Sequence, residues 1–149
     1  MFNENLKLSG QIAIVLKDKD GNVKEERTEK NLVVTTGLNY IASRMKDASA
    51  TAMTHMALGS GTTSAAAGQT DLVTLLGARE ALDSTTVTAN AVAYVSSFEA
   101  GDATGAVTEA GIFNASTSGT MLCRVVFSVV NKAADDTMTV TWTITLAAS

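Results

Sequence analysis

Polar and apolar residues alternate without interruption from residue 137 to residue 146. Threonine occupies every odd position of this run, and an apolar residue, with Trp142 at the centre, occupies every even position. Side chains of a β-strand point to opposite faces with a period of two, so the run predicts an antiparallel strand with one buried face. The pattern therefore indicates a mainly β protein.

A second pattern predicts a β-hairpin near the start of the chain. Residues 10–16 (GQIAIVL) read as a strand, residues 18–22 (DKDGN) carry the Asp-Gly turn signal, and residues 23–34 return as the partner strand. The preceding residues, 1–8, are expected to form an extended tail whose apolar anchors are Phe2, Leu6 and Leu8.

One amphipathic helix is predicted over residues 37–46. Leu38, Ile41, Ala42 and Met45 share a helical face there, and Thr35 or Thr36 offers an N-cap. Gly59 to Gly68 reads as a loop of small residues, and a helical turn capped by Thr70 is expected over residues 70–76. Further strands are expected over residues 53–58, 79–83, 86–98, 106–114, 121–130 and 138–146. About eight strands indicate a single domain over residues 1–149, an antiparallel β-sandwich or jelly-roll-like fold with one helix.

Composition excludes several classes of protein. The net charge is −4 and no basic cluster is present, which argues against direct binding of nucleic acid. The single cysteine, Cys123, excludes an intramolecular disulfide. The first residues lack the features of a signal peptide, and no apolar run approaches the ~18 residues of a membrane span. We therefore expect no membrane association.

The candidate chemical motifs have simpler structural interpretations. The DKDGN turn lacks the ligand spacing of a calcium loop, and Gly59-Ser60-Gly61-Thr62-Thr63 lacks the lysine of a phosphate-binding loop. His55 and Cys123 could form a nucleophilic pair, but Cys123 lies in an apolar stretch where a buried thiol is expected.

Acid–base chemistry has one further candidate pair, Glu80 and Glu109. For Glu109 we expect a structural role instead, in which its carboxylate accepts hydrogen bonds from the backbone of a neighbouring loop. Trp142 is expected in the core. We therefore expect no enzyme activity, no cofactor and no metal.

Three segments resemble, in their order along the chain, structural proteins of tailed bacteriophage virions. The first is residues 56–63 (MALGSGTT) followed by residues 70–72 (TDL), and the second is residues 107–114 (VTEAGIFN). The third is residues 119–127 (GTMLCRVVF) running into residues 136–142 (DTMTVTW). The resemblance covers roughly residues 30–146 and consists of strand and turn patterns without catalytic residues.

The resemblance implies a β-sandwich protein of the virion, made in the host cytoplasm, and above all a capsid decoration (cement) protein. Such proteins sit as symmetric homo-oligomers, often trimers, on the outside of the shell and bridge subunits of the major capsid protein. We expect contact surfaces on the charged hairpin of residues 17–30, on the loop of residues 59–68 and on the tail of residues 1–8. The candidate contact residues are Phe2, Leu6, Lys17, Lys19, Lys24, Thr62 and Thr63.

Two other interpretations stay open. A neck, tail or fibre-attachment protein would show the same motifs. A carbohydrate-binding β-sandwich would need exposed aromatic rings, whereas Trp142 is assigned to the core, Tyr40 to the helix and Tyr94 to a strand.

Overall fold

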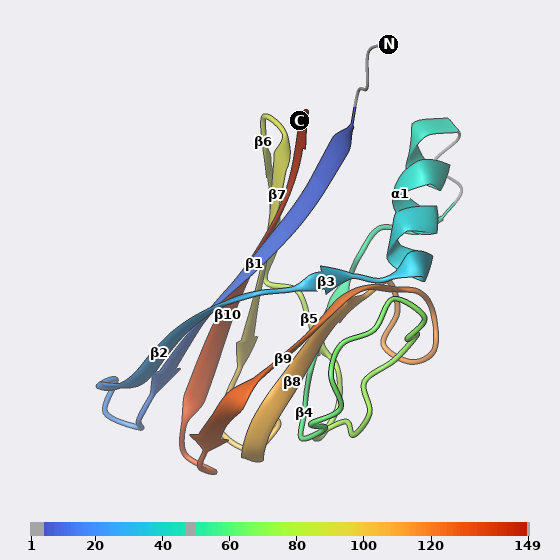
Figure 1. The fold of residues 1–149 in the computed structure, drawn as a ribbon. Coiled ribbons are helices and arrows are strands. Elements are labelled where there is room, and N and C mark those ends of the chain that lie inside the picture. The colour runs from blue at the N-terminus through green and yellow to red at the C-terminus, as the bar shows by residue number, and fades with distance from the viewer. Residues whose placement is uncertain (1–4, 47–49, 149) are drawn as a thin grey trace.

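The computed structural model describes residues 5–46 and 50–148. In this part of the chain two five-stranded antiparallel sheets pack face to face as a β-sandwich, and one short helix lies at their edge (Figure 1). This confirms the predicted mainly β sandwich with one helix. Phe2 lies outside the described residues.

The two sheets, called A and B, each contain strands from distant parts of the sequence. The strands of sheet A are, in their order across the sheet, β2 (Val23–Lys30), β1 (Leu6–Lys17), β10 (Thr137–Ala148), β7 (Ala91–Phe98) and β6 (Ser84–Thr88). The strands of sheet B are β3 (Leu32–Val33), β9 (Met121–Lys132), β8 (Gly105–Phe113), β4 (His55–Gly59) and β5 (Glu80–Ala81).

Strand β10 has the predicted alternation of buried and exposed faces. Met138, Val140, Trp142 and Ile144 are buried, whereas the threonines between them are half-buried on the outer face of sheet A. Trp142 lies opposite Ile12 of β1 and Tyr94 of β7, at the centre of the main core. The predicted core position of Trp142 is therefore confirmed.

The predicted strand over residues 23–34 is two strands that belong to different sheets. The chain leaves sheet A at Asn31, whose backbone N–H donates to the Gly10 carbonyl, and continues into sheet B as β3. Asn31 Oδ1 accepts a hydrogen bond of 2.9 Å from Trp142 Nε1. The approach requires a glycine at position 10, because a Cβ there would lie 1.6 Å from Asn31 Oδ1.

The predicted strand over residues 86–98 is instead the hairpin of β6 and β7. Its turn lacks glycine, and Ala89 adopts a left-handed φ of 52°, which an alanine rarely takes. Asn90 in the turn donates from Nδ2 to the Leu146 carbonyl at 2.6 Å, so the turn is held by β10. This tertiary contact explains why local sequence signals did not show the turn.

Other boundaries differ at the ends of elements. Strand β1 begins at Leu6 and its first residues pair with the end of β10, so residues 6–8 belong to sheet A and not to a tail. Residues 70–76 contain no helical turn, because two of their backbone N–H groups donate to Glu109 instead. The strand predicted over residues 79–83 is reduced to the two residues of β5.

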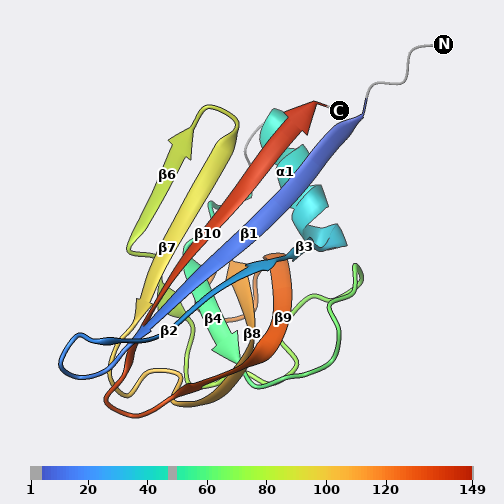
Figure 2. The same ribbon diagram turned by 60° about the vertical axis from the view of Figure 1, so that its left-hand side comes forward.

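Helix α1 (Thr35–Lys46) is tied to the start of β9. Thr36 Oγ1 donates to the Met121 carbonyl, so this hydroxyl fastens the helix to sheet B and does not cap it. Gly37 is buried, and a Cβ there would lie 2.0 Å from the Leu122 carbonyl oxygen. Beyond this contact the helix runs beside the ends of β1 and β10 (Figure 2).

Candidate interaction surfaces

Glu109 of β8 is the anchor of the small-residue loop. Its side chain is fully buried on the outer face of sheet B. Oε1 accepts hydrogen bonds from the backbone N–H groups of Gly61 at 2.9 Å and Thr74 at 2.7 Å, and Oε2 accepts one from Val73 at 3.0 Å. The predicted role of Glu109 as an acceptor for the backbone of a neighbouring loop is therefore confirmed.

Arg124 of the neighbouring strand β9 completes this anchor. Its Nε lies 2.9 Å and its Nη2 2.7 Å from Glu109 Oε2, and both side chains are fully buried. Its Nη1 donates to Gln69 Oε1 at 2.9 Å, which ties a second part of the loop to the same pair. A single charge within the apolar segment 121–127 was the signal in the sequence that could have identified Arg124.

The environment keeps Glu109 ionised. Burial by itself would raise the pKa of this carboxyl group, but the three backbone N–H groups and Arg124 together lower it below its ordinary value. The buried carboxylate and guanidinium therefore compensate each other, and the backbone of residues 61–74 is fixed around them. Thr108 adds a further tie, since its Oγ1 donates to the Gly61 carbonyl at 2.8 Å.

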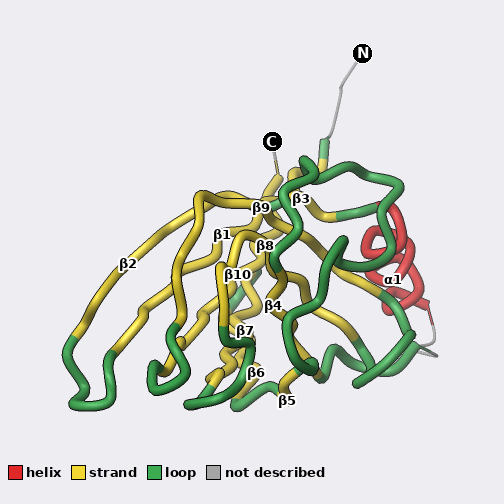
Figure 3. The backbone as a smooth tube through the Cα atoms, turned by 90° about the horizontal axis from the view of Figure 1, so that it is seen from below, coloured by secondary structure: helices red, strands yellow, loops and turns green. Residues whose placement is uncertain are grey.

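The loop carries Thr62 and Thr63, which are exposed. Both candidate contact residues lie immediately after the anchored Gly61. They belong to the long loop between β4 and β5, which runs beside sheet B on the side away from sheet A (Figure 3). A Cβ at position 61 would lie 2.4 Å from Glu109 Oε1, so glycine is required for the loop to approach the carboxylate. The structure thus presents these threonines on a fixed backbone.

The charged hairpin contains the candidate residues Lys17, Lys19 and Lys24. Its turn is closed by Asp18, whose Oδ1 accepts hydrogen bonds from the backbone N–H groups of Asp20 and Asn22, both at 2.9 Å. Lys17 and Lys19 are exposed. Lys24 Nζ lies 2.6 Å from Asp136 Oδ2, so its charge is already paired within the chain.

In each of the two candidate catalytic pairs, the two side chains lie on opposite faces of sheet B. Register along β4 places His55 and Glu109 on its outer face, while Cys123 and Glu80 lie at positions of the inner face. Burial raises the pKa of the Cys123 thiol well above its ordinary value, which disfavours the nucleophilic thiolate. Neither pair can therefore act on one substrate.

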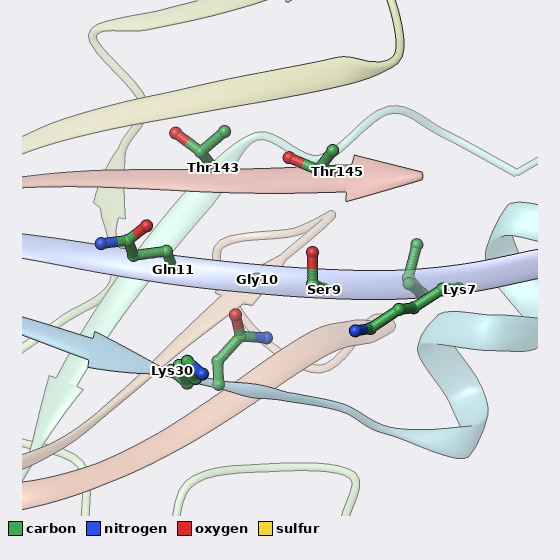
Figure 4. Close-up of a pocket in the computed structure, with 9 residues that line it drawn as sticks. Lys7, Ser9, Gly10, Gln11, Lys30, Thr143 and Thr145 are labelled. Carbon is green, nitrogen blue, oxygen red and sulfur yellow. The ribbon is translucent and has the colours of Figure 1, made fainter. Parts of the chain in front are cut away.

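A polar groove lies on the outer face of sheet A. It has a volume of about 320 Å³ and is lined by side chains of β1, β10 and β2 (Figure 4). Ser9 and Gln11 of β1 lie opposite Thr145 and Thr143 of β10, whereas Lys7 extends from the other side of β1, the side of Lys30. These groups could hydrogen-bond a polar ligand, but the lining contains no aromatic ring on which a sugar could stack.

An apolar cavity of about 200 Å³ separates α1 from the ends of β1 and β10. Leu6, the remaining candidate contact residue within the described part of the chain, lines this cavity and is 70% exposed. Met45 of α1 lines the same cavity and is 86% exposed. The predicted apolar face of the helix is therefore only partly covered.

Comparison of the chain with protein-family models, with curated proteins and with solved structures gives no match. Among the described residues no helix has the length and apolar character needed to cross a membrane. Within residues 5–46 and 50–148 no group of three or more His, Cys, Asp or Glu side chains is arranged to hold a metal ion.

Proposed function

We propose that this chain is a non-enzymatic structural protein of a tailed-bacteriophage virion, and specifically a capsid decoration protein that binds the outer shell of major capsid protein. The observation that carries the proposal is the arrangement of the three segments that resemble such proteins. They provide β4, β8 and β9, which are neighbours in sheet B, and the first part of β10 in sheet A. Glu109 of the second segment binds Gly61 of the first and Arg124 of the third.

This arrangement suits a docking protein. The loop around Thr62 and Thr63 is held by a buried ion pair and by backbone hydrogen bonds, so little conformational entropy is lost when it binds a shell subunit. Several copies arranged as a symmetric oligomer, such as a trimer, would add their individual contacts into avidity. The exposed Lys17 and Lys19 of the charged hairpin are a second candidate contact.

The alternative location within the particle is the neck or the tail, including a fibre-attachment site. The two locations differ in the number of copies, and quantitative mass spectrometry of purified source particles measures that number relative to the major capsid protein. A copy number comparable with the coat protein supports decoration. A copy number near that of portal or tail components moves the protein to the neck or tail, and absence from particles overturns the proposal.

A second experiment tests the loop itself. We expect the double variant Thr62→Asp/Thr63→Asp to bind particles stripped of this protein at least tenfold more weakly than the natural chain, since two carboxylates would be desolvated at the contact. The matched control is Thr117→Asp, another exposed threonine in a loop of the same sheet. Equal binding of both variants would exclude the loop as the contact surface.

A further inference from the structure

The β-sandwich has four sheet edges in the described part of the chain, and they differ in how open they are to another strand. Strands β3 and β5 are only two residues long. In β2, six of the eight residues are charged. Short edge strands and charged side chains are the usual protection of an edge against pairing with another chain.

Strand β6 (Ser84–Thr88) has none of these protections. No charged residue and no proline occurs from Ser84 to Ser97, all five residues of β6 are exposed, and four of them are β-branched or aliphatic. Val87 is 70% exposed. The outer backbone N–H and C=O groups of β6 are therefore available to a neighbouring strand.

The edge is also held rigidly in place. Asp83 N–H donates to the Val95 carbonyl at 2.8 Å just before β6 begins. At the other end, the turn residue Asn90 exchanges two hydrogen bonds with Leu146 of β10. Pairing with another strand would therefore require little ordering of this edge.

We propose that β6 pairs with β6 of a second copy of this chain, antiparallel and across a two-fold axis, so that sheet A continues through both copies. An axis at Thr86 pairs all five residues of each strand and places Thr86 opposite Thr86 of the second copy. It also places Val87 opposite Thr85, both on the inner face, because Val87 lies in register with the core-packed Val92. Cross-strand pairs of β-branched residues on one face stabilise such a ladder.

The difference between the two edges of sheet A, β2 and β6, indicates that the partner of β6 is a second copy of this chain. Pairing of β6 with β2 of another molecule would form an open chain of subunits, and it would set uncharged side chains against six charged ones. Pairing of β6 with itself uses the same strand on both molecules, so the assembly closes as a dimer and leaves only protected edges. This inference does not depend on the virion proposal, and its two-fold axis differs from the trimer that the resemblance implies.

Two five-residue strands bury less area than a standard protein interface, so the dimer is weak and its formation depends on concentration. Sedimentation velocity of the full chain, from micromolar to millimolar concentration, tests it. We expect a monomer–dimer equilibrium whose dissociation constant rises about fivefold or more in Thr86→Lys, because two lysines would then face each other. Mixing Thr86→Lys with Thr86→Glu should restore dimers.

The matched control is Thr28→Lys, which places the same substitution at an exposed position of the charged edge β2 and should leave the equilibrium unchanged. A second readout is Thr86→Cys, which should form an intermolecular disulfide under mild oxidation while Thr28→Cys does not. The natural Cys123 is buried and does not compete. A chain that stays monomeric to millimolar concentration, an oligomer that Thr86→Lys does not weaken, or equal cross-linking of both cysteine variants would overturn the inference.

Discussion

The two sheets of this sandwich bury their strands in different ways. In sheet A, the central strands β1 and β10 alternate between a largely buried inner face and a half-buried or exposed outer face, which carries the threonines of β10. In sheet B, residues 107–113 of β8 and residues 56–59 of β4 are buried at every position. The difference arises because residues 60–79 lie over the outer face of sheet B, where Leu72 packs with Phe113 in a second, smaller core.

Covering the outer face of sheet B buries charged groups as well as apolar ones. Glu109 and Arg124 are both fully buried there, and they compensate each other while binding the loop. We therefore expect the outer face of sheet A to tolerate substitutions. A residue on the covered outer face of sheet B, in contrast, contacts buried side chains and the backbone of the loop above it. The comparison predicts where substitutions are costly, as the following experiments test.

The largest effect is expected for Glu109→Gln. An amide leaves the buried Arg124 charge uncompensated and turns a donor toward backbone N–H groups, so the free energy of unfolding should fall by about 3–5 kcal/mol. Urea unfolding measures this. The double variant Glu109→Gln/Arg124→Met should be destabilised by less than the sum of its single variants, and strict additivity would contradict the proposed coupling.

Acid should weaken the same network progressively. The pKa of Glu109 in the folded protein lies below its ordinary value of 4.5, so its contribution is complete above 4.5 and is lost as the pH falls through the folded pKa. The stability difference between the natural chain and Glu109→Gln should therefore shrink as the pH falls below about 5 in urea titrations. A difference independent of pH would show that the carboxylate charge is not what stabilises the loop.

A smaller effect is expected for Gly10→Ala in sheet A. The new methyl group would displace Asn31 Oδ1 and leave the buried Trp142 N–H without its acceptor, at a cost of about 1–3 kcal/mol. Unfolding followed by Trp142 fluorescence reports both the stability and the altered surroundings of the indole. Gly68→Ala is the control, because a Cβ there has open space around it.

The smallest effects compare the same substitution in both sheets. Thr108→Val in sheet B removes the hydrogen bond to the Gly61 carbonyl and should cost about 1 kcal/mol. Thr143→Val on the outer face of sheet A should change the free energy of unfolding by less than about 0.5 kcal/mol. Equal costs at the two positions in thermal or urea unfolding would remove the distinction between the sheets.

Local patterns in the sequence predicted the long strands in both sheets, whereas they missed the turn that separates β6 from β7. The alternation of β10 and the Asp-Gly turn of the first hairpin are complete signals within a few residues, and both predictions are confirmed. The turn at Ala89 has no such signal, because the contact of Asn90 with β10 stabilises it. The role of Glu109 was predicted, but its partner Arg124 was not.

The sequence by itself determined the fold class, the buried face of β10 and the core position of Trp142, since these follow from the period of two along a strand. Only the tertiary structure decided that the chain changes sheets at Asn31, that Glu109 and Arg124 meet beneath residues 61–74, and that β6 is an open edge. These features depend on pairings between residues far apart in the chain. Local propensity carries no information about which distant groups satisfy a buried charge or leave a strand unpaired.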